Sequence, residues 1–420
     1  MFNIARLRDG IRAHFDTEKR ALHIHAAAGR FGRFAVCLFM LFTGQAFAQP
    51  NRNADIRFVN VADSTQGLSE FSQFPAINNR GTVSFVATQN SGVQEVFKWE
   101  RRVLRTIAST SGSHFTFFGD NIVINNAGVV GFQASLNTGG RAVGIFTTDG
   151  LTTKTIVNST DQGLPGFGIG SPSINASGTV AFEALRNGFR SSIIFTGDGS
   201  ALTPILDTLN SDFGSFGAVA INARGEIVFR GIHKDKSEGI FIAIPSPDEK
   251  GKNEGISAGP LNVVDIVDTN SFGFFGFGDP VINNAGIVAD EAGGAARVEI
   301  FSGDAKGITA RTDPSSKLFT EFEHPSINNR GAVAFSAFEA NGAQGIFVEL
   351  TGGALPLAVL QSGDPLFGSR VTAVSVGRFA FNDHFRLVFG YELEDGRSGI
   401  AVACLKSDEE GQGEESESEE

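Results

Sequence analysis

Short runs of alternating hydrophobic and polar residues recur along most of this chain. After Gly81, for example, Val83, Phe85 and Ala87 fall on one face of an extended segment, and the intervening residues fall on the other. Alternation with a period of two is typical of a packed β-strand. The pattern therefore predicts an all-β protein built from short strands.

Each run follows the same turn signal, which reads Ile-Asn-x-x-Gly-x-Val-x-Phe with small variations. Seven copies occupy residues 77–85, 124–132, 174–182, 221–229, 282–290, 327–335 and, in degenerate form, 381–389. The Asn side chain can close an Asx-turn, and the Gly three residues later tolerates a positive φ. This combination favours a type I turn with a glycine bulge between two antiparallel strands. Each copy is therefore predicted to be a hairpin corner.

The spacing of the copies predicts the architecture. The turn positions lie 45 to 61 residues apart, and a period of that length is typical of β-propellers. The first unit contains four strand candidates, at residues 74–78, 82–88, 94–100 and 103–110, and four strands make one propeller blade. We predict a seven-bladed β-propeller of four-stranded antiparallel blades. A β-solenoid and two packed sheets are the alternatives.

The two ends of the repeat region complement each other. Residues 56–63 read as a fourth strand without a unit of its own, whereas the seventh unit stops after its third strand at Leu405. If the N-terminal strand completes the last blade, the ring closes and no sheet edge is left unpaired there. An open solenoid would need capping units, and none is visible in the sequence.

The segments outside the repeats differ in composition. Basic residues precede an apolar run at residues 34–42, and Ala46-Phe47-Ala48 before Gln49 is a small-x-small cleavage signal, so residues 1–48 read as a secretory signal peptide. The apolar run is too short to span a bilayer, and no stable membrane span is expected after cleavage. The repeat domain then covers residues 49–406. Residues 407–420 hold eight acidic residues and no basic one, and they read as a disordered acidic tail.

Composition narrows the possible partners. The net charge is −12 at pH 7 and no basic stripe exists to displace counterions, which argues against nucleic acid. Tyr and Trp, which usually form stacking platforms, occur once each against 40 Phe. Loss of the leader would remove Cys37 and leave Cys404 as the one cysteine, so neither an intramolecular disulfide nor a cysteine zinc site is expected.

The most regular copies resemble a known family. Residues 175–182 and 328–335, which end in Ala-Phe, resemble the repeats of secreted bacterial choice-of-anchor proteins, a family defined by a tandem Asn-x-x-Gly-x-x-x-Ala-Phe motif. Residues 124–131 are more distantly similar to extracellular HAF repeats. The resemblance covers residues 56–405. It implies export and a repeat fold, and it brings no catalytic residues.

One candidate site lies where a copy departs from its siblings. In the fifth copy Asp290, followed by Glu291, takes the place of the second-strand Phe. A carboxylate in a core position is costly unless it is paired, and local departures from a rule are where function is expected. The alternative is a widened edge or a register shift around Gly293 and Gly294.

A second candidate site lies three residues before the turn signal. The residues at this position, in blade order, are Phe74, Asn121, Ser171, Ala218, Asp279, His324 and Arg378. Equivalent positions in a closed ring form a circle about its axis, so Asp279, His324 and Arg378 are expected to be neighbours at one end of the channel. Convergent ionisable groups in a concavity indicate a binding site. Independent solvation of the strand ends is the alternative.

The sequence contains no phosphate loop, metalloprotease helix or nucleophile elbow, and we expect no cofactor or bound metal. We predict an exported, non-enzymatic and monomeric propeller that binds a protein or glycan and is secreted, periplasmic or attached to the cell surface. The alternative is an extracellular polysaccharide hydrolase or lyase with its active site at the mouth of the channel.

Overall fold

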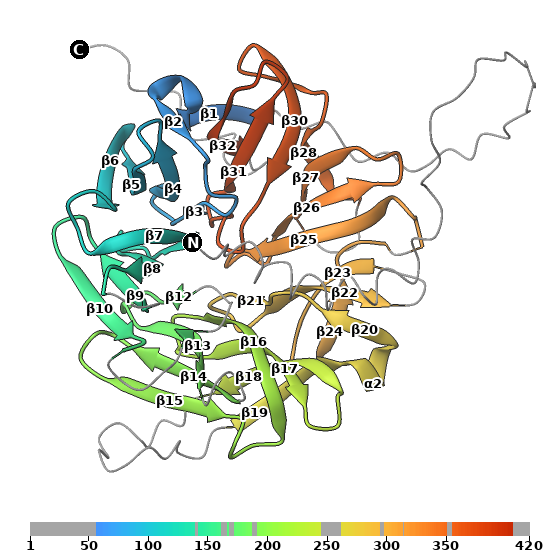
Figure 1. The fold of residues 1–420 in the computed structure, drawn as a ribbon. Coiled ribbons are helices and arrows are strands. Elements are labelled where there is room, and N and C mark those ends of the chain that lie inside the picture. The colour runs from blue at the N-terminus through green and yellow to red at the C-terminus, as the bar shows by residue number, and fades with distance from the viewer. Residues whose placement is uncertain are drawn as a thin grey trace, which may run out of the picture. The chain divides into compact units, whose positions relative to one another are not determined.

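The computed structural model describes residues 56–138, 142–160, 166–167, 172–186, 191–244, 262–294, 298–313, 315–350 and 355–405. Within these residues, seven antiparallel sheets follow one another around an axis (Figure 1). The chain is a seven-bladed β-propeller, and the predicted fold is confirmed. The predicted signal peptide at residues 1–48 and acidic tail at residues 407–420 lie outside the described residues.

The first three blades share one plan, in which the strand that precedes the turn signal lies nearest the axis (Figure 1). Blade one contains β2 (Leu68–Ser69), β3 (Ala76–Ile77), β4 (Val83–Gln89), β5 (Gln94–Glu100) and β6 (Val103–Ser109). Blade two contains β7 (Phe115–Ile124), β8 (Val130–Leu136), β9 (Val143–Thr148) and β10 (Thr153–Asn158). Blade three contains β11 (Gly166–Phe167), β12 (Ser173–Ile174), β13 (Val180–Arg186), β14 (Ser191–Gly197) and β15 (Leu202–Asp207).

The next three blades repeat this plan. Blade four contains β16 (Phe213–Ile221), β17 (Ile227–His233), β18 (Glu238–Ile244) and β19 (Asn262–Asp268). The short helix α2 (Thr269–Phe272) leads to blade five, with β20 (Phe274–Phe277), β21 (Val281–Ile282), β22 (Val288–Gly294), β23 (Val298–Asp304) and β24 (Gly307–Ala310). Blade six contains β25 (Phe319–Ile327), β26 (Val333–Glu339), β27 (Gln344–Glu349) and β28 (Leu357–Gln361). Across the described residues, no helix has the length and apolar character needed to cross a membrane.

The seventh blade joins the two ends of the repeat region. It contains β29 (Pro365–Leu366), β30 (Ser369–Ser375), β31 (Arg386–Leu393), β32 (Ser398–Leu405) and β1 (Ile56–Asp63). Strand β1 pairs antiparallel with β32, with Ile56 opposite Leu405 and Asp63 opposite Gly399. The short helix η2 (Ser64–Gln66) then leads into blade one. The predicted ring closure is therefore confirmed, and the solenoid and two-sheet alternatives are wrong.

The turn signal forms the predicted hairpin corner. In the first copy, the Gly81 N–H donates to the Asn78 carbonyl at 2.9 Å, and the Asn78 N–H donates to the Thr82 carbonyl at 3.0 Å. Gly81 has φ +78°, which is the left-handed conformation that this turn requires. In the degenerate last copy Phe385 takes the Gly position with φ +52°, so this side chain is held in a conformation that costs free energy.

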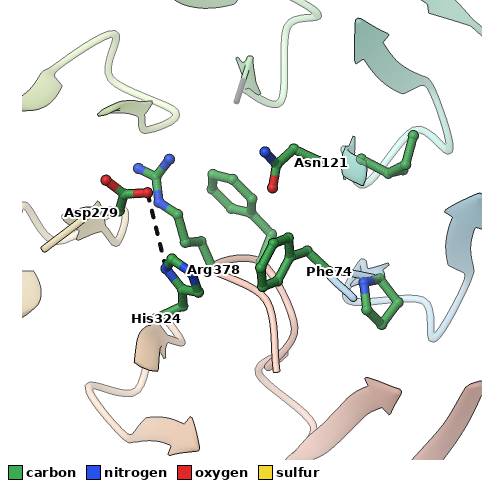
Figure 2. A pocket seen from close by; sticks show the side chains of 8 residues that line it. Phe74, Asn121, Asp279, His324 and Arg378 are labelled. Carbon is green, nitrogen blue, oxygen red and sulfur yellow. Dashed lines mark ion pairs between the residues drawn. The ribbon is translucent and has the colours of Figure 1, made fainter. Parts of the chain in front are cut away.

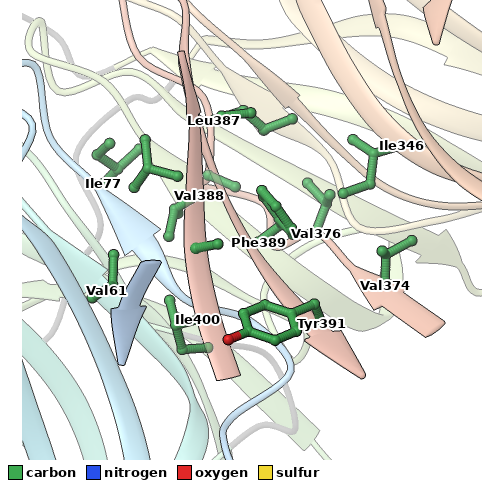
Figure 3. Packing of buried hydrophobic residues seen from close by; sticks show 14 of the residues in the cluster. Val61, Ile77, Ile346, Val374, Val376, Leu387, Val388, Phe389, Tyr391 and Ile400 are labelled. Atoms are coloured by element: carbon green, nitrogen blue, oxygen red, sulfur yellow. The ribbon is translucent and has the colours of Figure 1, made fainter. Parts of the chain in front are cut away.

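Neighbouring blades cover both faces of the middle strands. In β4, Val83, Ser84, Phe85 and Val86 are all buried, although the alternating pattern alone is compatible with one exposed face. Figure 3 shows how this arises for β31 and β32. Their side chains pack against Val61 of β1 in the same blade, against Ile77 of blade one and against Ile346 of blade six. The stacking of blades about the axis therefore supplies the hydrophobic core.

Candidate functional site

Side chains from the position three residues before the turn meet at a cavity on the axis. Neighbouring blades are in direct contact at this level, since Phe74 and Asn121 form a parallel β-bridge. The cavity contains about 470 Å³ of space, part of it open to solvent, and is lined by Phe74, Pro75, Asn121, Ile122, Asp279, His324, Arg378 and Phe379. We call it the axial cavity. The structure thus brings the three predicted ionisable residues together, and their role in binding stays a prediction.

Two members of the predicted circle do not contribute to the axial cavity. Ala218 is buried and is not among the lining residues, whereas Ser171 lies outside the described residues. The lining therefore comes from blades five, six, seven, one and two. Figure 2 shows Asp279, His324 and the guanidinium group of Arg378 on one side and Phe74 and Asn121 on the other. The cavity is ionisable on one side and mainly apolar on the other.

His324 and Asp279 form the solvent-accessible part of the ionisable side. The His324 Nδ1 lies 4.0 Å from the Asp279 Oδ2, and about a third of each side chain is exposed (32% and 35%). The His324 ring stands edge-on to Phe74, with ring centroids 4.8 Å apart. His324 has φ +36°, and strained backbone of this kind in a bulky residue is often found at functional sites.

The surroundings of His324 favour its neutral form. Burial by the cavity walls lowers the pKa of His324, and the positive charge of Arg378 lowers it further. The carboxylates of Asp279 and Glu323 raise the pKa, but their effect does not offset burial. A neutral imidazole has one nitrogen that donates a hydrogen bond and one that accepts, so His324 can do both toward a ligand.

Arg378 crosses the axis from blade seven to the opposite blades. Its Nη2 donates to the Val219 carbonyl of β16 at 3.0 Å and to the Pro280 carbonyl next to β21. The residue is only 6% exposed, and its guanidinium lies over the Phe379 ring at 5.4 Å. Its Nε and Nη1 have no hydrogen-bond partner among the described residues. The cavity wall therefore contains a buried guanidinium with unused donors.

Asp290 and Glu291, the other predicted pair, do not line the axial cavity. Asp290 lies opposite Phe301 in an unbroken β22–β23 register, as Phe335 lies opposite Phe347 in blade six. A register shift does occur opposite Gly293 and Gly294, between Phe274 and Gly276 in the pairing of β20 with β22. The Asp290 carboxylate nevertheless occupies the same core position as the Phe of other blades. Asp290 is fully buried, and burial, followed by the charge of Glu291, raises its pKa well above the usual range. Burial thus favours the neutral form of this side chain.

The Asn of the turn signal has a second role that the sequence analysis missed. Its Oδ1 accepts hydrogen bonds from N–H groups two and four residues later, as Asn78 does from Arg80 and Thr82. Its Nδ2 donates to the carbonyl of the equivalent Asn in the next blade. Six such bonds of 2.9–3.2 Å are present among the described residues: Asn78 to Asn125, Asn125 to Asn175, Asn222 to Asn283, Asn283 to Asn328, Asn328 to Asn382 and Asn382 to Asn78. We call these residues the Asn circle.

The Asn circle surrounds a second cavity that contains about 810 Å³ of space, part of it open to solvent. Arg378 and Phe379 line both cavities, so these two side chains form the partition between them. The signal that could have revealed the circle is the presence of Asn at the same position in all seven copies. An isolated turn uses its Asn only for hydrogen bonds within the turn. A closed ring places the seven Asn residues at the same height along the axis, where each can reach the next blade.

The chain was compared with protein families, curated proteins and solved structures. Residues 59–211 match the model of a family of unknown function, DUF7453, and no curated protein matches the chain. The β-propeller domain of the Trilobed protease from Pyrococcus furiosus, described as having an open velcro topology, is 13% identical with a TM-score of 0.51, over 81% of this chain and 93% of that one. The present ring differs because β1 and β32 close it.

Two peptidase structures are similar to a comparable degree. A prolyl endopeptidase is 11% identical with a TM-score of 0.50, over 81% of this chain and 50% of that one. Prolyl oligopeptidase B from Galerina marginata is 11% identical with a TM-score of 0.50, over 78% and 47%. The present chain therefore spans about half the length of these peptidases. The likeness shows the β-propeller fold alone.

Proposed function

We propose that this chain is a non-enzymatic module that binds a protein or glycan, and that the axial cavity is its ligand site. The observation that carries the proposal is the convergence of Asp279, His324 and Arg378, from three blades, with Phe74 and Asn121 from two others. A concavity with a few convergent polar groups and apolar walls is typical of ligand sites. The closed ring supports this role, because it holds side chains from five blades around one cavity.

The lining residues favour binding over catalysis. Among the lining residues that the structure describes, Asp279 is the one carboxylate, and no Ser, Thr, Cys or Lys is present. Most glycoside hydrolases need a pair of carboxyl groups that flank the scissile bond, and covalent catalysis needs a nucleophile. Neither arrangement is found in this cavity.

A polysaccharide hydrolase or lyase is the second candidate, and one observation favours it. A neutral His324 beside Asp279, with Nδ1 and Oδ2 4.0 Å apart, resembles a general base with an orienting carboxylate. Turnover of any polysaccharide in a panel, lost in His324→Ala, would favour this candidate over the binding module.

The experiment that tests the binding module uses arrays of glycans and peptides. We expect the wild-type chain to be retained by one ligand class, and Asn121→Ala and His324→Gln to weaken retention about tenfold, because each removes a polar contact from the cavity. Asp265→Asn, an exposed change on β19, is the matched control and should bind as the wild type does. Equal binding by all four proteins would refute the cavity as the ligand site.

We also propose that the chain is exported and acts as a monomer. The basic and apolar leader and the Ala-Phe-Ala signal support export, as does the resemblance to secreted choice-of-anchor proteins. Mass spectrometry of the protein from the culture medium or periplasm should give an N-terminus at Gln49, and light scattering should give the mass of one chain. An intact leader on the exported protein would contradict the first expectation.

A further inference from the structure

We propose that the axial cavity recognises an acidic glycan, and that the carboxylate of a uronate residue pairs with Arg378. This inference rests on the proposed role of the cavity as a ligand site and names the class of ligand. It follows from the unused donors of a buried cation, from the other polar groups of the cavity and from its apolar wall.

Arg378 has more hydrogen-bond donors than the protein satisfies. A guanidinium has five N–H groups, and the two on Nη2 donate to the carbonyls of Val219 and Pro280. The three N–H groups on Nε and Nη1 have no partner among the described residues, although the side chain is 94% buried. Unpaired buried donors are costly, and more so when the group is charged. An anion that enters the cavity would satisfy them with charge-assisted hydrogen bonds.

The carboxylic acids near Arg378 do not supply this anion. Asp279 and Asp290 lie close enough to attract Arg378, but neither forms an ion pair with it among the described residues. Asp290 has both oxygens without a hydrogen-bond partner among the described residues in a fully buried position, where burial raises its pKa and favours the neutral form. Asp279 instead faces His324. The positive charge of Arg378 is therefore available to a ligand.

The remaining groups favour a sugar acid over a peptide carboxylate. Asp279 accepts hydrogen bonds, and His324 and Asn121 both donate and accept them; the three come from blades five, six and two. The hydroxyl groups of a sugar ring can donate and accept at several points around its edge, whereas the carboxylate end of a peptide offers Asp279 few donors. The Phe74 ring, which stands edge-on to His324 at 4.8 Å between centroids (Figure 2), provides an apolar surface beside the polar groups for the C–H groups of a sugar.

A matched pair of ligands tests the inference on the full chain. Isothermal titration calorimetry would compare an oligogalacturonate with the same oligosaccharide after reduction of its carboxylates to primary alcohols. We expect the acidic form to bind at least tenfold more tightly, as typical hydrogen bonds to charged groups imply. Asp279→Asn should strengthen binding of the acidic form several-fold, because it removes a negative charge from a partly exposed position beside the ligand. Arg378→Met should make the two affinities equal.

The outcomes separate the two proposals. Equal affinities of the wild type for the two oligosaccharides, with both lost in His324→Gln, would overturn the uronate assignment and leave the ligand site intact. Tighter binding of an acidic peptide than of the oligogalacturonate would also overturn it. Failure of glycans and peptides alike to bind would overturn the ligand site itself. Because the comparison of ligands and the Asp279→Asn variant do not depend on Arg378→Met, a folding defect in that variant would leave the test in place.

Discussion

Two sets of residues, four positions apart in every copy of the repeat, contrast a structural role with a candidate functional one. At one level all seven copies carry Asn, and most of these side chains bond to the next blade. At the other level no two copies carry the same residue, and five of the seven side chains line the axial cavity. In a symmetric ring each blade has an equivalent neighbour, so the same residue can form the same hydrogen bond between every pair of blades. A small ligand has no such symmetry and presents a different group to each blade, so a ligand site needs different residues from different blades.

The largest expected effect comes from breaking the Asn circle. Asn328→Ala removes a donor to the Asn382 carbonyl and an acceptor for the N–H groups of Arg330 and Ala332. Because three backbone groups lose a partner, the free energy of unfolding should fall by about 3 kcal/mol. Urea denaturation followed by circular dichroism measures this. The control is Asn262→Ala at an exposed position on β19, where a loss below about 1 kcal/mol is expected. Equal losses would mean that the circle does not hold the ring.

A second test replaces the buried acid Asp290, where blade five departs from the repeat, by an amide that cannot ionise. Since the pKa of Asp290 is raised by burial, the folded state keeps a proton that the unfolded state loses, and stability falls as the pH rises above the usual Asp value. Asp290→Asn should therefore stabilise the protein by about 1–2 kcal/mol at pH 8 and by much less at pH 4. Thermal denaturation at the two pH values checks this, with exposed Asp265→Asn as the control. A gain that does not depend on pH would contradict the buried neutral acid.

A third test concerns the turn that carries the Asn. Gly178 has φ +88° and open space around its α-carbon, so Gly178→Ala introduces conformational strain without a clash. We expect a loss of about 1–2 kcal/mol in the free energy of unfolding. Gly293→Ala, also in open space but without a positive φ, should change stability by less than about 0.5 kcal/mol. Similar losses at the two positions would argue against the bulged turn.

The smallest expected effect concerns His324 and Asp279, which line the axial cavity. Substitution of either residue should change the free energy of unfolding little. The lowered pKa of His324 means that its stabilising contribution is present above pH 6.5 and is lost as the pH falls through 6.5 toward the folded value. His324→Asn, which tolerates the positive φ, should reduce this loss by a few tenths of a kcal/mol. Asp279→Asn should lower the pKa of His324 further, as NMR titration of the ring would show. A rise in the pKa would contradict the proposed electrostatics.

Several features followed from the sequence because their physical cause is local. The Asn and Gly spacing predicted the bulged turns, the alternation predicted the strands, and the complementary segments 56–63 and 399–405 predicted ring closure. The equivalence of positions in a ring then predicted that Asp279, His324 and Arg378 meet. The sequence could not decide whether Asp290 lies in the core or in a shifted segment. The pairing partners show that the register shift opposite Gly293 affects β20 and β22, whereas the β22–β23 pairing at Asp290 is unbroken.

By itself, the sequence determined the number of blades, the corner of each hairpin and the strand that closes the ring, since these depend on contacts between residues near in the repeat or at its two ends. Only the tertiary structure decided which groups each side chain meets across the axis. Asn side chains bond between blades because closure sets the turns side by side, and Arg378 reaches β16 because the channel is narrow enough to cross. Both contacts depend on the diameter of the whole ring, which no single repeat encodes.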